Sequence, residues 1–246
     1  MTTSFAQDGN NFAASTKEGI SMVFQVLSES DKTCQVGTGY YDSQGYSANR
    51  GQAIKKDTEG PITIPSEVRG YSVVAISHFA FYGCINITSI EIPNSVTYIG
   101  EFSIDNCYSL VSVIMSENVK EIGRNAFYGS KRLKNINLPP NLKVISQRMF
   151  GECESLESID IPNSVETIKE SAFTGCSSLS FIDIPNSVKN IERNAFYNCS
   201  SLEYVILSSN LKSIEPQTFD GCISLKNIDI PDGIEVINHS AFCDCI

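Results

Sequence analysis

The sequence has very few histidines. Only His78 and His239 occur among its 246 residues, and they occupy one position of a repeating pattern at its opposite ends, so they cannot share a site. No histidine therefore lies near a nucleophile with an orienting acid, which is the arrangement that most acid–base and nucleophilic catalysis needs. We expect a protein that is not an enzyme and that has no catalytic residues.

Basic residues are also scarce. The chain has 18 Lys and Arg against 28 Asp and Glu, a formal net charge of -10. Binding to nucleic-acid phosphates or to an anionic membrane surface needs clustered cations. The composition therefore excludes nucleic acid as the expected partner and disfavours a membrane surface.

Long apolar runs are absent as well. No stretch approaches the roughly 18 apolar residues of a transmembrane helix. The first twenty residues contain no continuous apolar run of the about 7–15 residues found in a signal peptide. Two locations fit these observations: the cell surface or exterior, with a leader that is absent from this chain, or the cytoplasm.

What the sequence does contain is a repeat of 23 residues. Five apolar columns keep this spacing through most of the chain. Such self-similarity predicts a solenoid in which each coil buries its apolar side chains against its neighbours. We assign residues 62–246 to a solenoid of about eight coils. One column reads Ile76, Ile99, Ile122, Ile145, Ile168, Ile191, Ile214 and Ile237.

Each coil has two halves. The motif Leu-x-x-Ile-x-Ile alternates with the two-residue period of a strand and often ends in proline, as at Pro93 and Pro162. Stacking these strands in register predicts a parallel sheet with rungs about 4.8 Å apart. The other half is too short for a long helix, so we expect short extended pieces, tight turns and single helical turns.

Residues 1–61 do not follow the repeat, and we predict a tail and a β-rich cap. The first 17 or so residues are polar and small, which predicts a weakly held terminus. Alternation from Ile20 to Val26, a polar turn and a return strand at 33–36 predict a hairpin that covers one end of the solenoid. A Gly- and Tyr-rich irregular loop over 37–51 and a short strand near 53–54 follow.

Two further features concern the first and last coils. Five residues inserted around 68–71 predict a surface loop. No cap is readable after Cys245. We expect the last coil to be open-ended and capable of self-association, to be covered by a partner chain, or to be the cut edge of a longer protein.

Cysteine is unusually regular in this chain. Stacked neighbours would have Cα atoms about 5 Å apart, within the disulfide range of about 4.4–6.8 Å. Their side chains would nevertheless point the same way, and Ser130 fills the remaining place, so we predict a ladder of small buried thiols that act as hydrophobic groups. The column reads Cys84, Cys107, Cys153, Cys176, Cys199, Cys222 and Cys245.

The end of the chain offers a possible metal motif, His239-x-x-x-Cys243-x-Cys245. A structural zinc site needs four ligands, and Cys245 belongs to the core column. We therefore expect no metal and no cofactor. Cys243 stands in a variable, mostly polar column and is predicted to be exposed.

The outward positions of the strands vary, and they hold the candidate binding site. Phe181, Tyr204 and Ile206 should cluster on two adjacent coils, flanked by Asp160 and Asp183. Exposed aromatic and aliphatic groups with an acidic rim favour partner binding. The candidate residues are Ser158, Asp160, Phe181, Asp183, Tyr204 and Ile206.

Other interpretations of these apolar and acidic residues stay open. The apolar groups are scattered surface residues, or neighbouring chains cover them in an array. The aspartates are ordinary solvated charges, a cation site or an acidic recognition strip. Ordinary solvated charge is the favoured interpretation of the aspartates, because an oxygen-rich calcium site needs six or more ligands.

Segments such as Ile92-Pro-Asn-Ser-Val96 and Ile191-Glu-Arg-Asn-Ala-Phe-Tyr-Asn-Cys199 resemble the BspA-type leucine-rich repeats of bacterial surface proteins. The resemblance implies a curved leucine-rich-repeat solenoid with a parallel β-sheet on the concave face and short irregular or extended segments opposite. It also implies roles in adhesion or in binding host components such as extracellular matrix, and it brings no catalytic motif. The leading hypothesis is a non-enzymatic surface or secreted module that binds a protein or glycan through the concave strand face. The alternative is a structural spacer segment of a longer surface protein.

Overall fold

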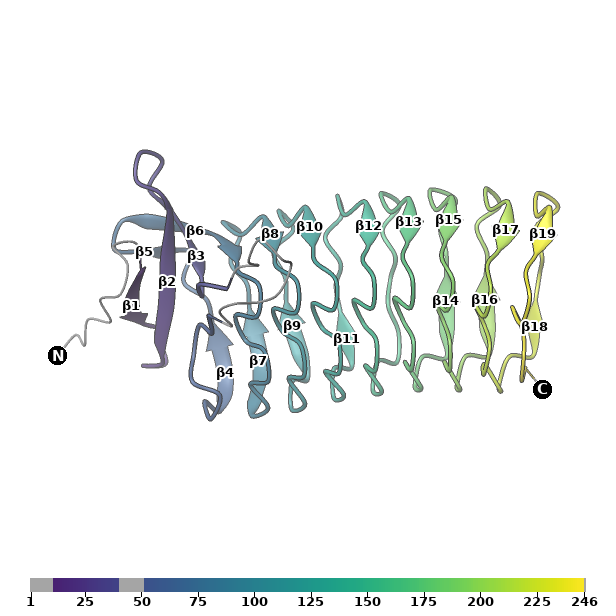
Figure 1. Cartoon of the computed structure of the whole chain (residues 1–246), viewed down its shortest axis with the longest axis horizontal. Coiled ribbons are helices and arrows are strands. Elements are labelled where there is room, and N and C mark those ends of the chain that lie inside the picture. Colours follow the sequence, from purple (N-terminus) through teal and green to yellow (C-terminus); the bar gives the residue numbers. More distant parts are fainter. Residues whose placement is uncertain (1–10, 40–50, 246) are drawn as a thin grey trace.

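The protein is a β-solenoid of about eight turns, as the repeat predicts. The computed structural model describes residues 11–39 and 51–245. Figure 1 shows the coils stacked in one row, with the N-terminal strands at one end and the last coil at the other. All secondary-structure elements within these two ranges are strands.

Two rows of strands run along the solenoid (Figure 1). We call them the first ladder, formed by the Leu-x-x-Ile-x-Ile motifs, and the second ladder, formed by the segments before the turns. The first ladder contains β4 (Gly60–Thr63), β7 (Ile87–Glu91), β9 (Ser112–Ile114), β11 (Asn135–Ile136), β14 (Phe181–Asp183), β16 (Tyr204–Ile206) and β18 (Asn227–Ile228). The second contains β6 (Tyr71–Ile76), β8 (Tyr98–Ile99), β10 (Glu121–Ile122), β12 (Val144–Ile145), β13 (Thr167–Ile168), β15 (Asn190–Ile191), β17 (Ser213–Ile214) and β19 (Val236–Ile237).

The first ladder confirms the predicted parallel pairing and its register. Ile90 lies opposite Val113, and Ile182 lies opposite Val205, in each case 23 residues apart. The prediction of a strand in every coil is wrong at one place, since residues 156–161 have no strand and interrupt the ladder between β11 and β14. Leu156 and Ile159 of that coil are still buried in the core.

The second ladder confirms the short extended pieces, but it adds an unpredicted feature. From β8 on these strands have two residues each, and the ladder pairs in parallel in three groups, β6-β8-β10, β12-β13-β15 and β17-β19, as Ile145 does with Ile168. The coil therefore has regular backbone hydrogen bonding on two sides instead of one.

The third side of the coil consists of turns, and the predicted single helical turns do not form there. The amide of Met149 donates to Ser146 O at 3.1 Å, and that of Gly151 donates to Arg148 O at 3.2 Å. Arg148 and Glu152 have φ of 51° and 57°, a left-handed conformation that stops a right-handed helix from continuing. The same conformation recurs in every coil, at Phe79, Phe102, Asn125, Ser171, Asn194, Gln217 and Ser240 and at Gly83, Asn106, Gly129, Gly175, Asn198, Gly221 and Asp244.

Glycine alternates with larger residues in the second of these columns. A Cβ at Gly129 would lie 2.5 Å from Oδ1 of Asn106, and a Cβ at Gly175 would lie 2.7 Å from Oε1 of Glu152. The side chain of one coil therefore covers the glycine of the next.

The core between the three sides is formed by stacked columns. The phenylalanine rings of neighbouring coils are nearly parallel, with centroids 5.2 Å apart for Phe173 and Phe196. The cysteines are free thiols, as predicted, and those of the repeat column are buried up to Cys222. Their predicted role as simple hydrophobic groups is incomplete, because each thiol from Cys107 onward donates to a backbone carbonyl of the preceding coil, as Cys176 does to Phe150 O at 3.1 Å.

The predicted hairpin cap is present as β2 (Ser21–Ser28) and β3 (Thr33–Val36), which pair antiparallel. β3 also pairs in parallel with β6, so the hairpin extends the second ladder. Residues 11–15, expected to belong to a weakly held tail, form strand β1 (Asn11–Ser15) against β2 because Phe12 stacks on Phe24.

The insertion around 68–71 is also more ordered than expected. β5 (Glu67–Val68) pairs antiparallel with β6, and the Arg69 guanidinium lies 5.0 Å from the Phe12 ring centroid. The expected strand near 53–54 does not form, although Ala53 N donates to Ala80 O at 2.7 Å. Most of the predicted irregular loop, residues 40–50, lies outside the described residues.

Candidate partner-binding face

The predicted apolar patch lies on β14 and β16. Phe181 is the register partner of Tyr204, and Asp183 is the partner of Ile206. Strand alternation turns Ile182 and Val205 into the core and leaves Phe181, Tyr204 and Ile206 44%, 49% and 52% exposed. The clustering of these three side chains on adjacent coils is therefore as predicted.

Ser158 and Asp160 lie in the coil before β14. Both are exposed, whereas Ile159 and Ile161 beside them are buried. Ser180 N donates to Glu157 O at 3.5 Å, which links this coil to the one that contains Phe181. All six predicted residues thus lie on the outer face of three successive coils.

Sequence reasoning missed Lys226 as a member of this face. Its Nζ lies 5.9 Å from the Tyr204 ring centroid and 2.7 Å from Oε2 of Glu203. The hydrogen bond that Lys226 donates to the Glu203 carboxylate raises the pKa of Lys226 above its usual value, so the amine remains charged. The pair Lys134 and Glu157, in the same column of earlier coils, is the sequence signal that could have indicated it.

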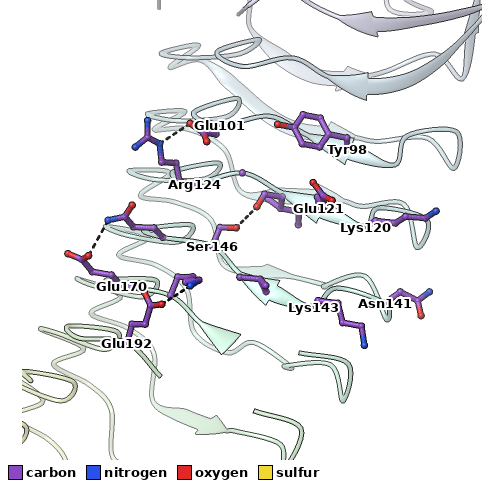
Figure 2. Close-up of a pocket in the computed structure, with 15 residues that line it drawn as sticks. Tyr98, Glu101, Lys120, Glu121, Arg124, Asn141, Lys143, Ser146, Glu170 and Glu192 are labelled. Atoms are coloured by element: carbon purple, nitrogen blue, oxygen red, sulfur yellow. Dashed lines mark hydrogen bonds and ion pairs between the residues drawn. The ribbon is translucent and has the colours of Figure 1, made fainter. Parts of the chain in front are cut away.

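A second feature is an open groove of about 960 Å³ on the second ladder (Figure 2). Its charged walls are largely neutralised by ion pairs between coils, such as Arg124 with Glu101 at 2.8 Å and Lys169 with Glu192 at 2.7 Å. None of the six predicted residues lines it. The lining residues are Tyr98, Glu101, Lys120, Glu121, Ile122, Gly123, Arg124, Asn141, Lys143, Val144, Ser146, Gln147, Lys169, Glu170 and Glu192.

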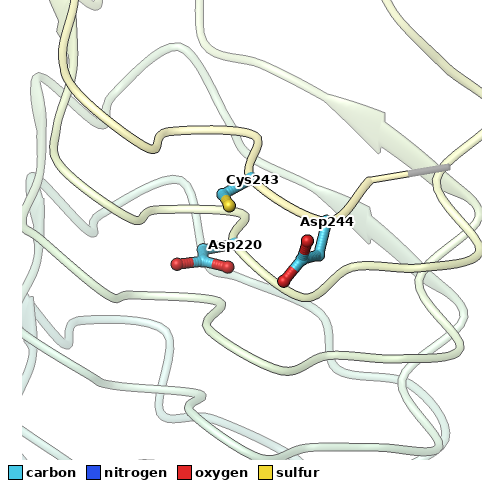
Figure 3. A group of neighbouring side chains, drawn as sticks. All are labelled: Asp220, Cys243 and Asp244. Carbon is cyan, nitrogen blue, oxygen red and sulfur yellow. The ribbon is translucent and has the colours of Figure 1, made fainter.

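Asp220, Cys243 and Asp244 form a small cluster in the last two coils (Figure 3). Their ligand atoms lie within 4.8 Å of one another, but Asp220 also accepts a hydrogen bond from Gln217 at 3.1 Å. Three donors are one short of the four protein ligands of a structural zinc site, so we assign no metal to them. The Cys245 thiol is used elsewhere, since it donates to Phe219 O at 3.1 Å.

Cys243 is exposed, as predicted. The negative charge of Asp244 raises the pKa of the Cys243 thiol above its usual value. The thiol therefore stays protonated at neutral pH and is a poor nucleophile.

Within residues 11–39 and 51–245, no helix has the length and apolar character needed to cross a membrane.

Parallel ladders at a constant 23-residue register, closed by turns around stacked Phe and Cys columns, define a leucine-rich-repeat solenoid. The model of the BspA type Leucine rich repeat region matches residues 61–177 and 143–246. The chain belongs to this family. No curated protein matches the chain.

Several solved structures share the fold. The leucine-rich repeat protein TpLRR of T. pallidum is 26% identical, with a TM-score of 0.72, and the match covers 87% of this chain and 92% of that one. A leucine-rich repeat protein of Bacteroides ovatus is 28% identical, with a TM-score of 0.60 over 97% of this chain and 50% of that one. The pneumococcal vaccine antigen PcpA, at 19% identity, has a TM-score of 0.60 over 91% of this chain and 71% of that one, which shows likeness of fold alone.

Proposed function

We propose that this chain is a non-enzymatic binding module of a bacterial surface or secreted protein. It binds a protein or a glycan through the face formed by Ser158, Asp160, Phe181, Asp183, Tyr204 and Ile206. The observation that carries this proposal is the pair of exposed aromatic rings at register partners Phe181 and Tyr204. In the other coils from β7 to β18, their column holds small polar residues, namely Ser89, Ser112, Asn135, Ser158 and Asn227.

The chemistry of the patch supports binding. Exposed aromatic and aliphatic groups held on a rigid sheet lose little conformational entropy on association, and tyrosine is enriched among residues that dominate binding energies. Membership of a family found in surface proteins supports the location, and PcpA, a neighbour in fold, is described as a vaccine antigen.

A screen of the purified chain against immobilised extracellular-matrix proteins and a glycan array tests the proposal. For a ligand that binds, we expect the double substitution Phe181→Ala and Tyr204→Ala to weaken affinity at least tenfold, because each side chain contributes at least about 1 kcal/mol at a binding centre. The thermal midpoint should stay unchanged. Tyr108→Ala is the matched control, since Tyr108 is 44% exposed and lies three coils before β14. Equal binding by all three proteins, or no ligand in either screen, would contradict the proposal.

The spacer hypothesis is supported by a different observation. The phenylalanine stack is continuous from Phe127 to Phe242, and ion pairs join successive coils, as Glu166 does with Lys143 and Lys189. A spacer would tolerate every substitution on the face and would lose function when whole coils are deleted.

A further inference from the structure

We propose that the partner presents a basic protein segment, with Lys or Arg side chains against Asp160, Asp183 and Asp229 and an apolar side chain against Phe181, Tyr204 and Ile206. This inference rests on the proposed function, because it names the chemistry of the partner that the same face would bind.

The three aspartates form a stripe beside the aromatic pair. They occupy one column of the first ladder, in which Ile206 fills the place between Asp183 and Asp229. All three are exposed. Within the described residues, their carboxylates form no ion pair and no side-chain hydrogen bond.

The column of Glu157 and Glu203, on the other side of the aromatic rings, differs because its glutamates pair with lysines. Glu157 lies 3.5 Å from Lys134 Nζ, and Glu203 lies 2.7 Å from Lys226 Nζ. Cations from adjacent coils thus neutralise the glutamates on one side of the aromatic rings. The aspartates on the other side have no such cation, although the spacing between successive coils is the same there.

Like charges on adjacent rungs repel each other, as Asp160 and Asp183 do here, and a cation placed between them relieves this repulsion. The three carboxylates flank an exposed apolar centre, so one ligand could contact both. A basic and apolar protein segment supplies both kinds of group. A neutral glycan would leave the charges uncompensated, and an anionic glycan would meet them and the net charge of -10.

Charge complementarity of this kind gives specificity and a strong dependence on salt. It also distinguishes a specific role of the aspartate stripe from an effect of the net negative charge of the whole chain. Removing three charges from the stripe should matter far more than removing three exposed charges elsewhere.

The test uses a 12-residue peptide that alternates Lys or Arg with Leu and Gly, and the same peptide with Glu in place of each cation. Dissociation constants are measured for the full chain, for the triple variant Asp160→Asn, Asp183→Asn, Asp229→Asn, and for the control triple Asp57→Asn, Glu59→Gln, Glu117→Gln. The control carboxylates are exposed and lie outside β14, β16 and β18, and both triples change the net charge equally.

We expect the basic peptide to bind the full chain and the acidic peptide not to bind. The stripe variant should bind the basic peptide at least tenfold more weakly, and the control variant less than twofold. Raising the salt concentration should weaken binding to the full chain more than binding to the stripe variant. Equal losses in both triples, or no binding of the basic peptide, would overturn the inference.

The failure of this inference can be told apart from the failure of the proposed function. If Phe181→Ala with Tyr204→Ala abolishes binding of a screened ligand and the stripe variant binds it normally, the face is the site and the basic partner is wrong. If both variants bind that ligand normally, both proposals are wrong.

Discussion

The cysteine column shows what one position of the repeat requires. Ser130 takes the place of a cysteine, is fully buried, and donates to Ile104 O at 3.1 Å, as Cys153 does to Phe127 O at 3.2 Å. Thiol and hydroxyl share a small size and a hydrogen-bond donor, and both satisfy a carbonyl inside the core. The position therefore selects a donor as well as a small volume.

This requirement predicts the ranking of two substitutions at Cys176. Cys176→Ala removes one of the two hydrogen bonds that the buried Phe150 carbonyl accepts, the other coming from Cys153 N at 3.1 Å, and should lower the free energy of unfolding by about 1 kcal/mol. Cys176→Ser keeps a donor and should cost less than Cys176→Ala. Urea unfolding with linear extrapolation measures both changes. Equal destabilisation by Ala and Ser would show that the thiol acts only as a hydrophobic group.

At the scale of the element, the turn is the part of the coil that stores backbone strain. Two left-handed residues per coil let the chain reverse within a few residues, and several are neither glycine nor asparagine. Arg148 is an exposed example with φ of 51°. Its backbone conformation is one that asparagine adopts more readily than arginine.

Arg148→Asn should therefore stabilise the protein. The expected gain is about 0.5 kcal/mol, because asparagine is several-fold enriched in the left-handed region. Asn194 occupies the same column with φ of 59° and is not buried, so Asn194→Arg is the converse control and should destabilise by a similar amount. Thermal or urea unfolding of the two variants checks the sign. Loss of stability in Arg148→Asn would mean that the arginine side chain contributes more than its backbone conformation costs.

The elements also show how far sequence reasoning reaches. The apolar columns fix the register of the first ladder, and the two-residue alternation fixes which side Phe181 faces, so both were predictable. The second ladder was not, because two-residue pairing depends on how the coil closes in three dimensions. The left-handed turns were hidden by the variety of residues that adopt them. Lys226 and the groove depend on where long side chains lie.

At the scale of the whole molecule, the buried thiols act together on stability at high pH. Burial raises the pKa of the Cys84 and Cys222 thiols to about 12 and that of Cys176 well above its usual value. Unfolded thiols titrate near pH 8.5–9, roughly their unperturbed pKa. Above that pH, the unfolded chain binds fewer protons than the folded chain, so the free energy of unfolding falls as pH rises.

Urea unfolding between pH 8 and 11 should show this decline. Each thiol contributes about 1.4 kcal/mol per pH unit between its unfolded and folded pKa values. In Cys222→Ser one such contribution is absent, so the decline above about pH 9 should be shallower than in the unchanged chain by that amount. The comparison cancels the titration of Tyr and Lys. Identical slopes in the two proteins would show that Cys222 is not protected from deprotonation.

Glycine alternates with larger residues on the turn side, so successive coils are of two alternating kinds. We call this the parity of a coil. A coil with Asn106, Glu152 or Asn198 is followed by one with glycine, whose missing Cβ leaves room for that side chain. Removing residues 164–186 would place Glu152 beside Asn198, two coils of the same parity. Removing residues 164–209 would place Glu152 beside Gly221 and restore the alternation. Inserting or deleting coils in pairs therefore causes the least strain. The unit that such an array can duplicate or lose is two coils, twice the repeat visible in the apolar columns.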